Sequence, residues 1–159
     1  MQSWRMRQLK YLILIHVLSA IIGVGPTFFS HVLFRKNQTV KELKSSLALG
    51  KHLEKFPKIG GSIAVLTGIL LICLNDYGSF TKLWLIGSLA IYICIQIIVI
   101  GFGAPASNKL VQWVFNPEND HHEEIPQEQK QILAKVSNIF YVASSLGVLL
   151  FIFMIVKPV

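Results

Sequence analysis

The hydrophobic positions of the chain fall into four long, nearly uncharged stretches that polar segments separate. The first, residues 11–34, is an uncharged run of 24 residues, and the others cover residues 56–74, 83–104 and 132–156. At about 1.5 Å per residue, helices of these lengths cross the roughly 30 Å hydrocarbon core of a bilayer. We therefore predict a single domain, residues 1–159, with an all-α fold: an integral membrane, antiparallel four-helix bundle.

Composition supports a membrane protein and argues against an ordinary soluble domain. The chain is 53% hydrophobic and 14% charged, with a mean hydropathy of +0.57. A soluble four-helix bundle would show one apolar and one polar face on each helix, and these stretches do not. Both cysteines, Cys73 and Cys94, lie inside apolar stretches, which predicts buried free thiols and no disulfide.

The basic residues indicate how the bundle is oriented. The net charge is +7, but the charge is divided among segments that flank membrane spans, where anionic lipid headgroups explain it better than nucleic acid does. The segments after the first span and around the start of the fourth hold 10 Lys and Arg, against 5 on the other side of the membrane. Because basic segments stay in the cytoplasm, we expect both termini outside.

The two longer connections are less clear from their pattern. Residues 37–58 place Val40, Leu43, Leu47 and Leu53 at helical spacing among lysines. This spacing fits an amphipathic helix that lies in the membrane interface or extends the second helix, and a solvated loop fits as well. Residues 106–116 form a connection with an interfacial Trp113. Residues 117–128 have no apolar residue before Ile125, so we expect a mobile acidic loop there.

Polar and small residues recur every three or four positions within each span, so each helix presents one such stripe to its neighbours. One interpretation is packing alone, because small residues let backbones approach and hydroxyls bond to their own helix. The other is a polar seam that binds a ligand. The stripes comprise His16, Ser19, Gly23, Thr27 and Ser30; Gly61, Ala64, Thr67 and Gly68; Trp84, Ser88, Tyr92 and Gln96; and Asn138, Tyr141 and Ser145.

His16 is the residue with the strongest claim to chemistry. It lies six residues past Lys10, roughly 9 Å into the span, too deep for an imidazole to reach water. It is either a structural hydrogen-bonding group or a haem iron ligand, a quinone or substrate partner, or a proton relay. Ser88 lies at the same predicted depth, and Ser19, Thr67, Tyr92 and Ser145 fall deeper, so these six residues are the candidate ligand site.

The other four histidines are predicted at the opposite end of the bundle, too far away to supply a second haem ligand. They are His31, His52, His121 and His122. Together with Asp120, Glu123 and Glu124 they are a weaker candidate for a shared metal site, because their spacing matches no familiar ligand pattern.

A family resemblance rests on KYLILIHVLSAIIGVGPTFF, LTGILL, WLIGSLAIYI, Pro105 and FMIVKP. The chain resembles small bacterial predicted integral membrane proteins, grouped as a domain of unknown function with YndJ-like and CopD-like chains. More remotely it is similar to HemJ-type protoporphyrinogen oxidases and the copper-resistance D membrane domain, in which a first-helix histidine precedes a small-residue turn. The resemblance implies a multi-pass protein of the bacterial cell membrane and haem b at His16. The oxidases carry a lysine where this chain has Ser88, which argues against that activity.

Two functions therefore stand as hypotheses. The chain is either a membrane protein that binds haem, a quinone or another apolar ligand at His16, or a non-catalytic subunit whose polar stripes only hold helices together. Its expected partners are the lipid bilayer and another membrane protein or a second copy of itself. A transporter is less favoured because no charged residue lies at midspan.

The orientation is testable with reporter fusions. Alkaline phosphatase fused after Val159 is expected to be active, because the 10 to 5 division of basic residues places that end outside. Enzyme activity on whole cells measures this. An inactive phosphatase together with a bright fluorescent cytoplasmic reporter at the same point would reverse the orientation.

Overall fold

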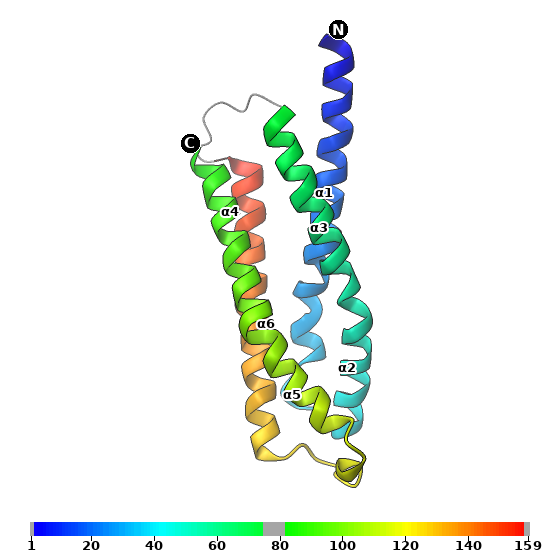
Figure 1. Cartoon of the computed structure of the whole chain (residues 1–159). Coiled ribbons are helices and arrows are strands. Elements are labelled where there is room, and N and C mark those ends of the chain that lie inside the picture. The colour runs from blue at the N-terminus through cyan, green and yellow to red at the C-terminus, as the bar shows by residue number, and fades with distance from the viewer. Residues whose placement is uncertain (1, 75–81, 158–159) are drawn as a thin grey trace.

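The computed structural model describes residues 2–74 and 82–157, which form helices and their connections without a strand (Figure 1). The all-α prediction is confirmed. The connection predicted between the second and third spans, at 75–81, lies outside the described residues. The elements are, in chain order, α1 (Gln2–Leu33), α2 (Val40–Leu53), α3 (Lys55–Leu74), α4 (Leu83–Gln96), the π-helical segment η1 (Ile97–Gly103), α5 (Ala104–Val114), the short 3-10 turn η2 (Pro117–Asn119) and α6 (Gln127–Val156).

These elements join into four helices long and apolar enough to cross a membrane: Arg7–Leu33, Val40–Leu74, Leu83–Val114 and Gln127–Val156. Consecutive helices run in opposite directions, so the start of α1 and the end of α6 lie at the same end of the bundle (Figure 1). Cys73 and Cys94 are free thiols as predicted, but both are exposed on the outer surface. The prediction that they are buried is wrong for the bundle by itself, because lipid takes the place of protein around them.

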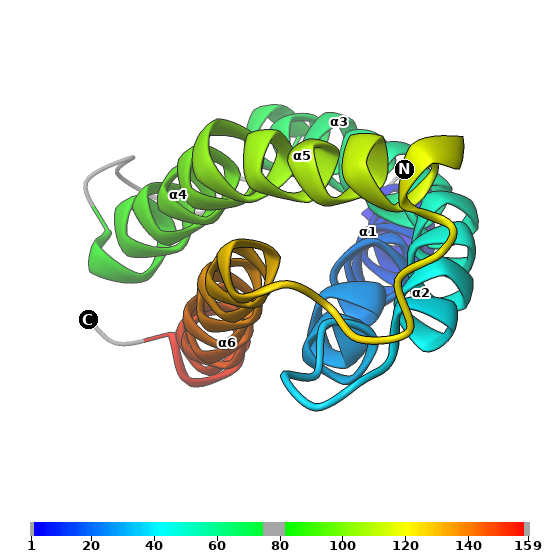
Figure 2. The same cartoon turned by 90° about the horizontal axis from the view of Figure 1, so that it is seen from below.

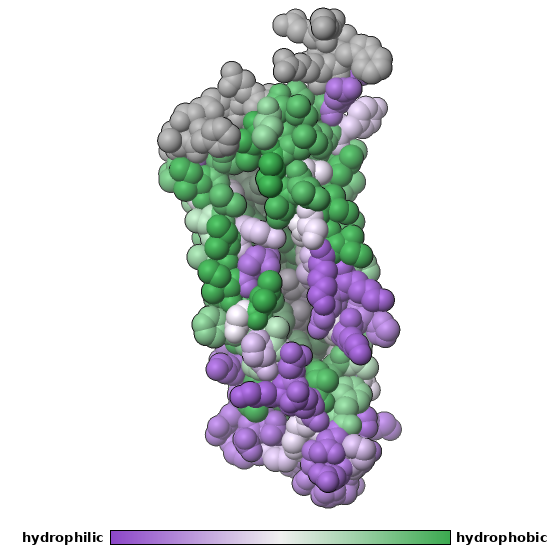
Figure 3. Space-filling model, viewed as in Figure 1, coloured by the Kyte–Doolittle hydropathy of each residue, from purple (hydrophilic) through white to green (hydrophobic). Residues whose placement is uncertain are grey.

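The second and third helices exceed the thickness of a bilayer. They contain 35 and 32 residues, or about 52 and 48 Å of helix, against roughly 30 Å of hydrocarbon. The extra length is α2 and α5. Figure 3 shows hydrophobic side chains along most of the bundle and hydrophilic ones gathered at the end that carries these two helices. We infer that this end stands outside the hydrocarbon core.

α2 settles the two interpretations of residues 37–58, since the segment is helical and extends the second span. The solvated-loop alternative is wrong. Thr39 and Glu42 form a capping box: the Glu42 amide donates to Thr39 Oγ1 (3.3 Å) and the Thr39 amide donates to Glu42 Oε2 (2.9 Å). The hydrogen bond from the Thr39 backbone amide holds the pKa of the Glu42 carboxyl below its usual range. The cap starts the helix, and Leu43 and Leu47 bury its apolar face.

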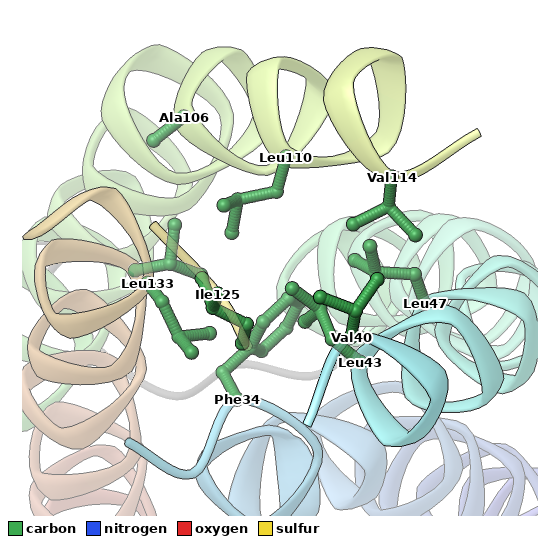
Figure 4. Packing of buried hydrophobic residues seen from close by; sticks show 10 residues of the cluster. Phe34, Val40, Leu43, Leu47, Ala106, Leu110, Val114, Ile125 and Leu133 are labelled. Atoms are coloured by element: carbon green, nitrogen blue, oxygen red, sulfur yellow. The ribbon is translucent and has the colours of Figure 1, made fainter. Parts of the chain in front are cut away.

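The best-packed core of the molecule lies at this same end, where α2 and α5 meet the start of α6 and the end of α1 (Figure 4). Leu43, Leu110 and Leu133 are fully buried there. Residues 106–116, expected to be a connection, are therefore mostly helix α5, because Ala106, Leu110 and Val114 repeat at helical spacing. The cluster comprises Phe34, Val40, Leu43, Leu47, Ala106, Leu110, Val114, Ile125, Leu133 and Val136.

The acidic loop is docked on this cluster, which corrects the expectation of a mobile segment. Ile125 is only 2% exposed within the cluster. The Val40 amide donates to the Glu123 carbonyl (3.3 Å), and Lys44 pairs with Asp120 (2.8 Å). Burial of Ile125 and these two polar contacts fix the loop, while the rest of the loop stays in water.

The third helix passes through Pro105 by widening into η1. Proline has no N–H, and its ring clashes with the carbonyl four residues earlier in a regular helix. The Ala104 amide instead donates to the Val99 carbonyl, five residues back, which is the π-helical pattern. The helix therefore continues into α5, beyond residue 104 where the predicted span ends.

The membrane part of the bundle is held by three helix pairs. α1 packs most extensively against α3, α4 packs against α6, and α1 and α6 join the two pairs (Figure 2). Among the described residues, α3 and α4 make almost no direct contact. Neighbouring helices therefore pack along three sides of the bundle. On the fourth side, between α3 and α4, the main contact among the described residues is that of α2 with α5 at the far end.

The α1–α3 pair meets backbone to backbone at two glycines. A Cβ placed on Gly23 would lie 2.7 Å from the amide nitrogen of Gly61, and one placed on Gly60 would lie 2.9 Å from the Gly23 Cα and from the Ser19 carbonyl oxygen. Backbone atoms cannot move aside as a side-chain tip does. Only glycine therefore allows the two helices to cross this closely.

We expect Gly23→Ala to destabilise the protein by about 2 kcal/mol, since the methyl group forces α1 and α3 apart. Thermal unfolding in detergent measures the effect. Gly25→Ala is the matched control, because a Cβ at Gly25 meets no atom within 4 Å. Equal melting temperatures for the two variants would show that the crossing is not close in the protein.

Candidate functional site

His16 lies on α1 with its ring against α3. Its Nδ1 is 2.9 Å from the Ala64 carbonyl oxygen and 3.1 Å from Thr67 Oγ1. A carbonyl oxygen only accepts hydrogen bonds, so Nδ1 is the ring nitrogen that carries the proton in the neutral imidazole. The other nitrogen, Nε2, is left with its lone pair and has no hydrogen-bond partner among the described residues.

Small residues on α3 make room for the ring. A Cβ placed on Gly68 would lie 3.1 Å from His16 Cε1, closer than most contacts of real side chains. Ala64, one turn away, exposes its carbonyl oxygen to the ring because its side chain is only a methyl group. Gly68 and Ala64, which belong to the packing stripe predicted from the sequence, therefore also make space for the His16 ring.

The serine and threonine hydroxyl groups of the candidate site are used within their own helices, as the packing interpretation expects. Each donates to the carbonyl oxygen four residues earlier, which satisfies the hydroxyl proton and leaves no donor for a ligand. Thr67 also accepts the bond from His16. The bonds are Ser19 to Ile15 (2.6 Å), Thr67 to Ile63 (2.6 Å), Ser88 to Trp84 (2.6 Å) and Ser145 to Tyr141 (3.0 Å).

Ser88 and Ser145 are not brought to His16 by any contact among the described residues. Ser88 is buried on α4, a helix that packs against α6 and not directly against α1. Ser145 is exposed on the outer face of α6. Its neighbour Ser144 takes the inward position and donates to the Thr27 carbonyl on α1 (3.0 Å). The stripe chosen from sequence on this helix was therefore displaced from the buried face.

Tyr92 reaches from α4 to α3. Its hydroxyl oxygen lies 3.9 Å from the position that a Cβ on Gly61 would occupy, and it has no hydrogen-bond partner among the described residues. Gly61 and Gly68 are seven residues apart, so they share one face of α3 and are separated by about 10 Å along its axis. The Tyr92 hydroxyl and the His16 ring therefore lie over the same face of α3, at two levels.

The remaining histidines do not form a metal site. His31 stacks on Tyr141 at 4.8 Å between ring centroids, and the His121 and His122 rings are 4.1 Å apart. Within residues 2–74 and 82–157, no three His, Cys, Asp or Glu side chains are placed to hold a metal ion. The weaker metal-site alternative has no support from the geometry.

Comparison with known proteins places the whole bundle in one family. No curated protein and no solved structure matches the chain significantly. A family model described as predicted integral membrane protein (DUF2269) matches residues 10–158, which include His16, the last three apolar spans and all but the first three residues of the first. The chain therefore belongs to the DUF2269 family of predicted integral membrane proteins.

Proposed function

We propose that this integral membrane protein binds an apolar ligand inside the bundle through Nε2 of His16. The observation that carries the proposal is the hydrogen bond from Nδ1 to the Ala64 carbonyl (2.9 Å), which fixes the tautomer and leaves Nε2 as a lone-pair donor. A polar atom within a membrane span is costly when it has no partner. A ligand that bonds to Nε2 removes that cost.

The contacts of His16 Nδ1 resemble those of histidines that bind metals and cofactors. Such a histidine usually donates its other ring N–H to a carboxylate or a backbone carbonyl, which fixes the ring orientation and raises the basicity of the free nitrogen. Ala64 and Thr67 provide this support from α3. If the role of His16 were purely structural, these contacts at Nδ1 would be sufficient and Nε2 would need no partner.

Tyr92 suggests what kind of ligand fits. The Tyr92 hydroxyl lies over Gly61 and the His16 ring lies over Gly68, and these two glycines are about 10 Å apart along α3. A quinol ring has para oxygens about 5 Å apart, and two hydrogen bonds of about 2.8 Å bring the span to about 11 Å. One quinol hydroxyl would donate to Nε2, and the Tyr92 hydroxyl would donate to the opposite oxygen.

Haem b is the other ligand that the donor set fits, with His16 as a single axial ligand. A second axial histidine is excluded within the described residues, because the other four lie at the α2 and α5 end of the bundle. The resemblance to HemJ-type oxidases that the sequence motifs suggest would imply haem, although no curated protein matches the chain. Ser88 stands where those enzymes have a lysine, so the proposal concerns binding and assigns no reaction.

The alternative is a bundle whose polar seam is structural and whose partner is another membrane protein or a second copy. The observations that favour it are the hydroxyl bonds within single helices and the glycine crossing of α1 and α3. In that case His16 acts only by bonding to α3.

Two substitutions separate the ligand role from the structural role. His16→Ala removes both ring nitrogens, whereas His16→Asn keeps an N–H donor near the Nδ1 position and removes Nε2. We expect the purified wild type to show a Soret band or, after solvent extraction, a quinone by mass spectrometry. Both variants should lose the ligand, and His16→Ala should also be less stable without ligand, by about 1 kcal/mol for the lost hydrogen bond.

His52→Ala is the control, since His52 is exposed on α2 and should keep the ligand. A wild-type protein without any chromophore or extractable quinone, combined with a melting temperature that falls only in His16→Ala, would establish the structural role instead. A ligand retained by His16→Asn would show that Nε2 does not hold it.

A further inference from the structure

An open groove runs along α6 beside η1, and neither His16 nor any other residue of α1 lines it. Its walls come from one face of α6 and from the first turn of η1. The glycine at the end of η1 keeps the two elements close, because a Cβ on Gly103 would lie 3.3 Å from Cγ2 of Ile139. The lining residues are Ile98, Gln131, Ala134, Lys135, Asn138, Ile139 and Val142.

The groove changes from polar to apolar along its length. Gln131, Lys135, Asn138 and Val142 follow one another at helical spacing on α6, so they lie in a row about 16 Å long. Gln131 lies nearest the α2 and α5 end, which stands outside the hydrocarbon core, and Val142 lies deepest. The other deep walls, Ile98 and Ile139, are apolar. This order of polarity is that of a phospholipid, from headgroup to acyl chain.

Lys135 provides a charge that protein does not neutralise. It is exposed, and no acidic partner contacts it among the described residues, whereas Lys130 on the same helix pairs with Glu124 (3.7 Å). A lysine whose stem lies against an apolar wall can hold its ammonium group at the membrane interface. An anionic phosphate is the natural partner of that group in a bilayer.

We propose that this groove binds one anionic phospholipid. The phosphate pairs with Lys135, and the Asn138 amide donates to an ester carbonyl one turn deeper. Gln131 contacts the headgroup alcohol, and an acyl chain lies against Ile98, Ile139 and Val142. The lipid belongs to the leaflet on the side that holds 10 of the 15 basic residues.

The test measures stabilisation of the detergent-purified protein by added lipid. Phosphatidylglycerol is expected to raise the melting temperature at lower concentration than phosphatidylcholine, and inorganic phosphate should not replace it. Lys135→Gln should raise the phosphatidylglycerol concentration needed for stabilisation about fivefold, which is the change in affinity expected when one interfacial lysine is lost. Lys130→Gln removes the same charge outside the groove and should leave the effect unchanged, and Lys135→Arg should retain it.

A further variant probes the deep end of the groove. Val142→Trp leaves the charge of Lys135 intact and should fill the place of the acyl chain. It should therefore weaken the effects of both lipids. Equal responses of the wild type and Lys135→Gln to phosphatidylglycerol would overturn the proposal. So would an equal loss in Lys130→Gln, since the effect would then come from net charge alone.

Discussion

The contact on which the membrane part of this structure depends is the crossing of α1 and α3 at Gly23 and Gly60. Lipid tails are as apolar as leucine side chains, so hydrophobic burial gives little reason for one helix to choose another within a bilayer. Close packing of backbones provides that reason, and two facing glycines make it possible. The same crossing sets the register in which the His16 ring meets the Ala64 carbonyl. The geometry of the candidate site is therefore a consequence of helix packing.

The molecule is stabilised by different forces at its two ends. Around α2, α5 and the docked loop, fully buried leucines form a core of the kind found in soluble proteins, with a capped helix and ion pairs at its edge. Within the spans, few residues are buried, and the exposed surface is apolar because lipid covers it. Individual spans would have little reason to stay together by burial alone, so the extramembrane cluster helps to hold the ends of all four helices.

The sequence was sufficient to predict the four spans, because length and the absence of charge decide whether a helix crosses a bilayer. The helical extension in α5 was missed because the uncharged apolar run of the third span ends at residue 104. The π-helical segment that carries the helix past Pro105 leaves no mark in the hydropathy pattern. Ser145 was chosen over Ser144 because lipid-facing and protein-facing positions are both apolar on α6, so no polarity contrast marks the buried face. His16 was identified as polar and deep, but only the structure shows which ring nitrogen is free.

The weak contact between α3 and α4 determines how a hydrophobic molecule would reach the interior. Separating those two helices breaks few packing interactions, whereas separating α1 from α3 would break the glycine crossing. If the bundle binds a ligand as proposed above, a molecule dissolved in the bilayer would enter sideways and never pass through water. Occupancy would then follow the mole fraction of that molecule among the surrounding lipids, and its solubility in the aqueous phase would have no direct bearing on binding.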